Sequence, residues 1–120
     1  MLIHGDLHYG NILQSNRHYK AIDVKGFIGQ NYMDTAQVIH SELLITNSHG
    51  NLDEKLAELN NIITLVAECS GFTKELLSQW LFISSVKRAV GGLLYMKNDE
   101  QKLGMKINQS ELYLKYVQQL

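Results

Sequence analysis

The pattern of apolar and polar positions divides the chain near residue 34. Before that point, "NILQS" and "HYKAIDV" are short runs of apolar and β-favouring residues, and the "SNR" between them is typical of a hairpin turn. After it, apolar residues recur at the three- and four-residue spacing of amphipathic helices. The sequence therefore predicts an α+β, mainly α-helical fold, in which an N-terminal β-hairpin leads into about four helices.

Two helices are predicted in the first half of the helical region. The first spans about residues 35–47, with Asp34 as its N-cap. The second begins after Asn51, where Glu54 completes the spacing of a capping box, and it ends just before Gly71. The apolar face of this second helix is predicted to comprise Leu52, Leu56, Leu59, Ile63 and Val66.

Two further helices are predicted in the second half. The third begins after Thr73 as its N-cap and runs to about residue 98, and the last begins after Asn108 or Ser110. The apolar stripe of the third helix is predicted to comprise Leu76, Trp80, Ile83, Val90 and Leu94. One face of the last helix is predicted to carry Tyr113, Val117 and Leu120.

The composition is that of one folded domain. The chain has 120 residues, of which 45% are hydrophobic and 19% charged, and this balance excludes a disordered chain. Its net charge of -1 speaks against a nucleic-acid-binding surface. Since it shows neither a signal-peptide pattern nor a long apolar run, we expect a cytoplasmic protein without membrane association. The single cysteine, Cys69, is expected to be a buried, reduced thiol.

The densest candidate chemistry lies in "HGDLHYGN", at residues 4–11. Asp6 lies between two glycines, which allow the backbone to approach a ligand closely, and its carboxylate can serve as a general base or a metal ligand. Asn11 adds a neutral oxygen ligand, and Asp23 ends an apolar run, where a strand terminus would hold its carboxylate. Two carboxylates and an amide oxygen suit a hard cation such as Mg²⁺ with a phosphate ligand.

These residues resemble the catalytic motifs of the protein-kinase-like superfamily. The kinase spacing H-x-D-L-x-x-x-N is matched by His4, Asp6, Leu7 and Asn11. Asp23 stands where the metal-binding aspartate follows across a hairpin. With the later "AIDVKGFIGQNYMDTA", the chain is similar to aminoglycoside 6-phosphotransferases (streptomycin kinases) and hydroxyurea phosphotransferases over about residues 2–36. Where that family has G-D-P-x-x-D-x-A, this chain departs from G-D-P with Gly29, Gln30 and Asn31.

The resemblance implies a role for each residue of the motif. Asp6 would orient or deprotonate the acceptor hydroxyl, and His8 would lie near the transferred phosphoryl group. Asn11 and Asp23 would hold Mg²⁺ against the phosphates of ATP, and Lys25 would reach a phosphate or the substrate. The implied reaction transfers the γ-phosphate of ATP to a hydroxyl of a small molecule such as an aminoglycoside.

The resemblance also implies an incomplete kinase fold. No glycine-rich nucleotide loop, and no strand lysine with a helix glutamate partner, precedes the catalytic motif in this sequence. We therefore expect residues 1–120 to form one partial kinase-like C-terminal lobe, without the N-terminal lobe. Residues 1–34 would supply the catalytic loop and metal-binding hairpin, and residues 35–120 the helical body. Little or no phosphoryl transfer is expected from these residues alone, as from a truncated, inactive fragment.

Two alternatives stay open. His4, Asp6 and His8 alternate as metal ligands on a strand would, and "GDLHYG" is similar to the G-D-x-H-G element of metallophosphoesterases. In the kinase interpretation, by contrast, His4 is structural and hydrogen-bonds the loop backbone. The other alternative is a non-catalytic helical fragment that forms a homodimer through apolar surface left by the missing lobe. The third predicted helix, apolar from Trp80 to Ile83, is the expected contact.

Overall fold

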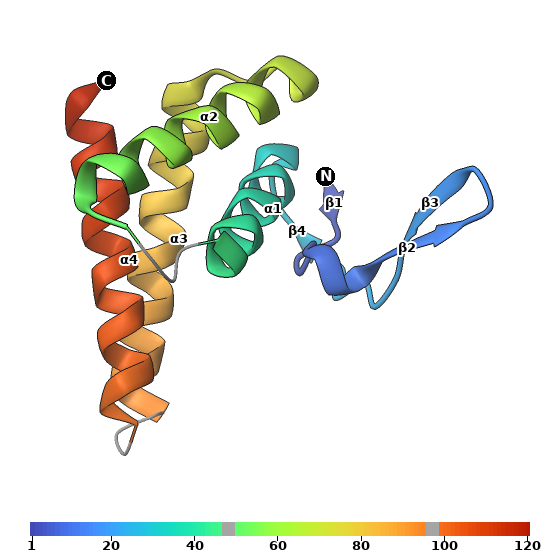
Figure 1. The fold of residues 1–120 in the computed structure, drawn as a ribbon. Coiled ribbons are helices and arrows are strands. Elements are labelled where there is room, and N and C mark those ends of the chain that lie inside the picture. Colours follow the sequence, from blue (N-terminus) through green and yellow to red (C-terminus); the bar gives the residue numbers. More distant parts are fainter. Residues whose placement is uncertain (47–49, 96–98) are drawn as a thin grey trace.

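The computed structural model describes residues 1–46, 50–95 and 99–120, with the backbone alone over residues 41–46. The chain is mainly helical with a small β component, which confirms the predicted α+β class. Figure 1 shows the strands of the N-terminal part on one side of the helices. Within the described ranges, no helix has both the length and the apolar character needed to span a bilayer.

Two small antiparallel sheets form the N-terminal part. β1 (Leu2–Ile3) pairs with β4 (Phe27–Ile28), and β2 (Ile12–Ser15) pairs with β3 (His18–Ala21) after the short 3-10 turn η1 (Tyr9–Asn11). The β2–β3 pair is the hairpin predicted from the sequence. Asn16 at its turn has a left-handed backbone with φ of 56°, which asparagine tolerates better than most residues. The hairpin is largely exposed and projects away from the helices (Figure 1).

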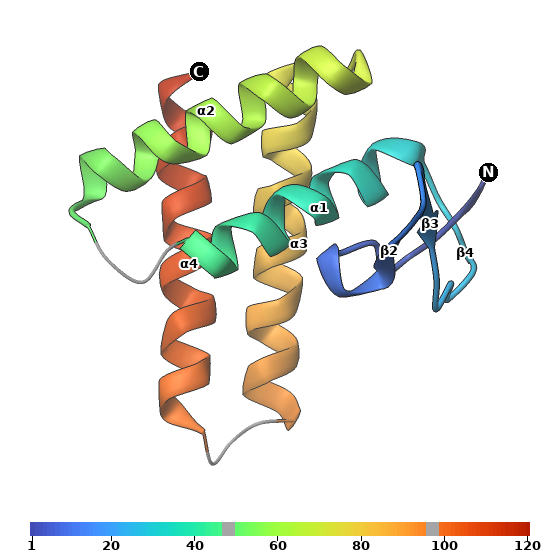
Figure 2. The same cartoon turned by 45° about the vertical axis from the view of Figure 1, so that its right-hand side comes forward.

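The described helices are α1 (Asn31–Thr46), α2 (Leu52–Ser70), α3 (Lys74–Tyr95) and α4 (Glu100–Gln119). α3 and α4 run side by side, and α1 and α2 cross them on one face, as Figures 1 and 2 show. All four contribute to one apolar cluster, which buries surface from water and so stabilises the fold. Its buried members are Ala36, Ile39, Leu56, Leu59, Ile63, Leu77, Leu81, Leu112, Tyr113 and Tyr116.

The ends of α2 follow the predicted signals. The Asn51 side chain accepts a hydrogen bond from the Glu54 N–H, and the Glu54 carboxylate accepts one from the Asn51 N–H, both at 3.0 Å. Gly71 ends the helix with a φ of 77°, the left-handed C-cap conformation that glycine favours. The predicted apolar face is confirmed at its centre, where Leu56, Leu59 and Ile63 are buried.

Two predicted helix starts are wrong. α1 begins at Asn31, before the predicted start, and Asp34 lies inside its first turn instead of capping it. α4 begins after Asp99, whose side chain accepts from a backbone N–H of the first turn, so Asn108 and Ser110 lie within the helix. Both errors arose because a polar residue inside the helix was interpreted as its cap. The predicted ends at residues 47 and 98 lie outside the described residues.

The apolar stripe predicted for α3 is confirmed at Trp80, which packs against the core, but not in the C-terminal half of the helix. Thr73 caps the helix as predicted, with Oγ1 accepting from a backbone N–H at 3.2 Å. However, Ile83, Val90 and Leu94 are 53%, 49% and 62% exposed. The buried residues of the helix are two leucines and four small residues: Leu77, Ser78, Leu81, Ser85, Ala89 and Gly92. Small residues allow neighbouring helices to approach closely, so hydrophobicity alone indicated the wrong face beyond Trp80.

Two smaller expectations also differ from the structure. Cys69 is exposed near the end of α2, because the face that carries it points away from the core. In α4, Tyr113 is buried as predicted, but Leu120 is exposed at the helix end. Tyr116 takes a core position instead, and its hydroxyl donates to Asn60 Oδ1 of α2 at 2.8 Å.

Candidate functional site

Residues 4–11 form a loop that is held by hydrogen bonds to His4. His4 Nδ1 accepts from the Asp6 N–H at 3.3 Å, and Nε2 lies 2.9 Å from the Ile22 carbonyl oxygen. These partners fit a neutral imidazole with its proton on Nε2. The contacts confirm that His4 bonds the loop backbone, and they join the loop to the segment that follows β3.

Asp34 holds the same loop from the first turn of α1. Its Oδ2 accepts from the His4 N–H at 2.6 Å, and its Oδ1 accepts from the Gly5 N–H at 2.8 Å. Hydrogen bonds to a carboxylate are among the stronger ones in proteins. The carboxylate is engaged here and cannot cap the helix, which explains the wrong assignment. One signal in the sequence could have indicated this role for Asp34. Asp34 matches the aspartate in the D-x-A part of the family pattern.

Asn11 and Asp23 are brought together at the base of the hairpin. Asn11 is buried, and its Nδ2 donates to the Asp6 carbonyl at 3.0 Å. Because Nδ2 is used in this bond, Asn11 Oδ1 is the atom that could bind a metal ion. No hydrogen-bond donor among the described residues is paired with that oxygen. The Ile22 N–H donates to the Asn11 carbonyl at 2.9 Å, so Asp23 directly follows the residue paired with Asn11. The backbones of the two predicted metal ligands therefore lie close together beside the ends of β2 and β3.

Asp23 has an unusual backbone and an exposed ion pair. Its φ of 57° is left-handed, and such non-glycine conformations are concentrated at functional sites. Its carboxylate accepts from Lys25 Nζ at 3.0 Å. This hydrogen bond, with the nearby charges of Asp23 and Asp6, raises the pKa of Lys25. Exposed pairs contribute little stability, so a divalent cation can compete with the ammonium for Asp23.

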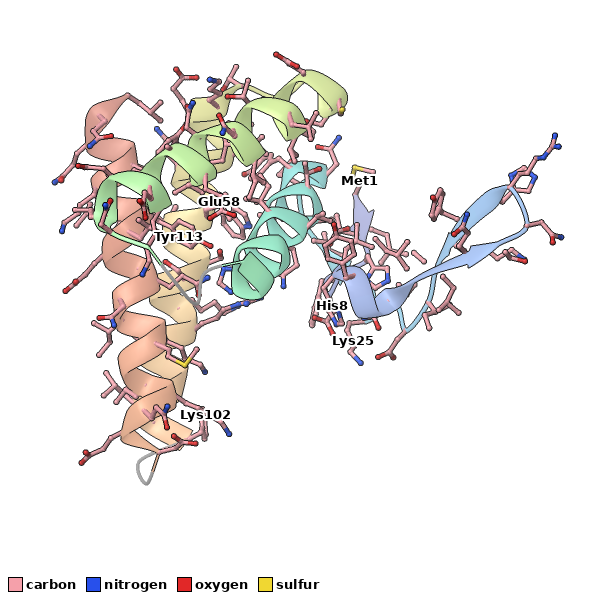
Figure 3. The ribbon with its side chains drawn as sticks, in the orientation of Figure 1. Met1, His8, Lys25, Glu58, Lys102 and Tyr113 are labelled. Atoms are coloured by element: carbon pink, nitrogen blue, oxygen red, sulfur yellow. The ribbon has the colours of Figure 1, made fainter. Side chains whose placement is uncertain are left out.

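The Asp6 carboxylate lies beside His8. His8 Nδ1 accepts from the Gly10 N–H at 3.1 Å, which places the proton of a neutral ring on Nε2. Nε2 lies 3.9 Å from Asp6 Oδ2, beyond hydrogen-bond distance, and both side chains are partly exposed. His8 and Lys25 lie on the same edge of the N-terminal part in Figure 3. A hydroxyl group that reaches this edge can donate its proton to Asp6.

Arg88 of α3 lies behind the loop, beside a groove of about 510 Å³. Its Nη2 donates to Gln37 Oε1 of α1 at 2.6 Å. Burial lowers the pKa of Arg88, and interactions with the ionised forms of Tyr113 and Asp6 counteract that shift. The groove touches Gly5 but is not lined by Asp6, so we do not assign it to the acceptor of a reaction at Asp6.

Substitution of Gly5 is expected to reduce the stability of the fold. Its φ is +80°, and an added Cβ would lie 2.2 Å from the Phe27 ring. We expect Gly5→Ala to lower the free energy of unfolding by about 2 to 3 kcal/mol, from left-handed strain and overpacking together. Urea unfolding followed by circular dichroism measures this loss.

Gly71→Ala is the matched control, because Gly71 also has a left-handed φ of +77° but open space around the added Cβ. Its expected cost is about 1 kcal/mol. Equal losses in the two variants would show that the Phe27 contact has no effect on stability.

The donor set fits Mg²⁺ only with ligands from outside the protein. In the part of the chain that the structure describes, no three His, Cys, Asp or Glu side chains are grouped to hold a metal ion. Mg²⁺ commonly keeps several waters and binds one or two protein ligands together with substrate phosphates. Asn11 and Asp23 are such a pair, so they fit a magnesium ion that is also bound to nucleotide phosphates.

The structure thus gathers Asp6, His8, Asn11, Asp23 and Lys25 around one loop and the adjoining hairpin. Comparisons with protein-family models, with curated proteins and with solved structures find no match for this chain. Its function is therefore inferred from its own motifs and geometry.

Proposed function

We propose that the chain carries the catalytic loop and metal-binding hairpin of a kinase-like phosphotransferase. The reaction is transfer of the γ-phosphate of ATP to a hydroxyl of a small molecule, of the aminoglycoside or hydroxyurea resistance type. One arrangement carries the proposal. The Asn11 side chain bonds the Asp6 carbonyl, while the Asn11 backbone bonds the residue before Asp23. Asn11 is therefore hydrogen-bonded to the backbone of Asp6 and to the residue next to Asp23.

Each residue contributes a separate function in this proposal. Asp6 orients the acceptor hydroxyl and accepts its proton. Asn11 and Asp23 hold Mg²⁺, which when bound neutralises the charge of the phosphates. With Mg²⁺ held by Asp23, Lys25 would be free to reach a phosphate oxygen. His8 keeps an N–H beside Asp6, where the phosphoryl group is transferred.

The contacts of His4 favour this proposal over a metallophosphoesterase-like hydrolase. A metal face of His4, Asp6 and His8 would need a free ring nitrogen on each histidine. In His4, Nδ1 accepts a backbone N–H and Nε2 lies at hydrogen-bond distance from a backbone carbonyl, so both nitrogens serve the loop itself. Releasing Nδ1 would cost the hydrogen bond from the Asp6 N–H, and releasing Nε2 would cost the one to the Ile22 carbonyl.

The proposal is tested by Mn²⁺ binding, with Mn²⁺ as a spectroscopic substitute for Mg²⁺. Electron paramagnetic resonance of free Mn²⁺ measures the affinity with and without ATP. We expect ATP to tighten Mn²⁺ binding, because its phosphates complete the coordination. Asp23→Asn should weaken that binding at least about tenfold, since a charged ligand is lost.

Two further variants sharpen the test. Lys25→Met should strengthen Mn²⁺ binding in the absence of ATP, because the competing ammonium is removed from Asp23. Asp53→Asn, an exposed acidic position in the first turn of α2, should leave the affinity unchanged. If Asp23→Asn and Asp53→Asn behave alike, the proposed metal site is wrong.

A further inference from the structure

The groove of about 510 Å³ beside Arg88 lies between the β1–β4 pair and the helices α1 and α3. Figure 1 shows β1 and β4 next to α1. Binding sites for small molecules commonly have volumes of about 300 to 1,000 Å³, with apolar walls and a few polar groups. The groove matches both features, and its apolar lining comprises Ile3, Phe27, Ile28, Met33, Trp80 and Ile83.

Two aromatic side chains of this lining are held in place by their neighbours. The Trp80 ring packs edge-on against the Tyr32 ring, with the ring centroids 6.0 Å apart. The Phe27 ring lies directly against Gly5, where there is no room for a Cβ. The wall of the groove is therefore formed in advance, and such preorganisation lowers the entropic cost of binding a ligand.

The polar lining residues give the groove a positive charge. The half-buried Arg88 guanidinium donates to the neutral Gln37 amide, and among the described side chains no carboxylate forms an ion pair with it or with Lys87. Asp34 is the one carboxylate among the described lining residues, and it already accepts two backbone N–H groups of the loop. Because a partly buried cation without a counter-ion is unfavourable, an anion that enters the groove gains a favourable pairing.

We propose that this groove binds a small apolar carboxylic acid, with its carboxylate on Arg88 and Lys87 and its apolar body against Trp80 and Ile83. Arg88 keeps further N–H donors for a carboxylate beside the one that it gives to Gln37. Inorganic phosphate fits less well, because it has no apolar body and would bring a second negative charge close to Asp34. The site is separate from phosphoryl transfer at Asp6, which does not line the groove.

Octanoate and 3-phenylpropionate are the probes, one aliphatic and one aromatic. Isothermal titration calorimetry measures their affinity, and we expect dissociation constants on the order of 0.1 to 1 mM for molecules of this size. The uncharged octanamide and 3-phenylpropionamide should bind at least about tenfold more weakly, because they cannot form a charge-assisted hydrogen bond. Trp80 is the only tryptophan in the chain, so a change in its fluorescence on binding places the probe in the groove.

Ile83→Glu tests the place of binding. Ile83 lines the groove and is 53% exposed, so the variant adds a carboxylate there without opening the core. It should weaken octanoate binding at least about tenfold, through charge repulsion and the loss of apolar contact. Leu65→Glu is the matched control, since Leu65 is an exposed leucine of α2 at 61% that does not line the groove. This control should leave the affinity unchanged.

Arg88→Met tests the charge, because it keeps an apolar side chain and removes the guanidinium. Octanoate should bind at least about tenfold more weakly to this variant, whereas octanamide should bind as before. Arg17→Met is the control, since Arg17 is exposed at the turn between β2 and β3. Circular dichroism confirms that each variant keeps its helices, and Ile83→Glu provides a test that does not depend on the folding of Arg88→Met.

Four results would each overturn the proposal. The first is no binding of either acid up to about ten times the expected dissociation constants. The second is equal affinity for the acids and their amides, and the third is binding of inorganic phosphate as tight as that of octanoate. The fourth is equal weakening of octanoate binding by Ile83→Glu and Leu65→Glu.

Discussion

Replacing Asp34 by alanine is expected to lower the free energy of unfolding by about 4 kcal/mol, because two charge-assisted hydrogen bonds are lost. The N–H groups of His4 and Gly5 would lose their common acceptor. With them the loop would lose the anchor that joins it to α1, so ATP-dependent Mn²⁺ binding should weaken as well. Urea unfolding measures the first effect, and electron paramagnetic resonance the second.

Asp53→Ala is the control for this prediction. Asp53 also lies in the first turn of a helix, so both variants lose a favourable interaction with the helix dipole. Asp53 is exposed and accepts no bond from the loop, so its expected cost is below about 1 kcal/mol. If the two alanine variants are equally stable, Asp34 does not anchor the loop.

Acidification is expected to destabilise the helical body through His40. His40 is buried, and its Nδ1 lies 3.0 Å from the Tyr113 hydroxyl, which also accepts from Gln109 at 3.2 Å. Burial, and then the charge of Arg88, lowers the pKa of His40 to about 3. In the unfolded chain, His40 has an ordinary pKa near 6.5. Between pH 3 and pH 6.5 the unfolded chain therefore binds more protons at His40 than the folded chain does.

The sign follows from that difference in protonation. The stability that neutral His40 provides is complete above about pH 6.5 and is lost as the pH falls toward 3. Between pH 7 and pH 5 the expected loss is about 2 kcal/mol. Urea unfolding at a series of pH values measures it in the native chain and in His40→Asn, which keeps an acceptor for Tyr113.

The pH series has its own control in His18→Asn, because His18 is exposed on β3. His40→Asn should flatten the dependence between pH 7 and pH 5, whereas His18→Asn should retain it. An unchanged slope in His40→Asn would mean that another group causes the acid sensitivity.

Local sequence signals predicted those parts of the fold that depend on neighbouring residues. The β2–β3 hairpin, the capping box of Asn51 with Glu54 and the C-cap at Gly71 all depend on contacts within a few residues. The face of α3 depends on what the helix packs against. Its small buried residues are invisible to a count of apolar positions, so beyond Trp80 the prediction selected exposed residues.

In the candidate site, too, the sequence predicts what depends on neighbouring residues and misses what depends on distant ones. The motif pattern selected Asp6, Asn11 and Asp23, and hydrogen bonds link Asn11 to the Asp6 backbone and to Ile22, next to Asp23, because the hairpin register follows from local turn chemistry. The function of Asp34 could not be derived from its neighbours, because its partners lie about 30 residues away across the fold. A polar residue before a helical pattern is ordinarily a cap, and only the tertiary contact distinguishes a cap from an anchor.

The most direct test of the proposed active site is the position of a bound ion. Paramagnetic Mn²⁺, added with ATP to isotopically labelled chain, broadens the amide signals of residues near it in nuclear magnetic resonance spectra. We predict that broadening centres on residues 4–11 and 22–25 and disappears in Asp23→Asn. Broadening centred on the acidic first turn of α2, or none beyond that of free Mn²⁺, would contradict the assignment of this loop as a phosphotransferase site.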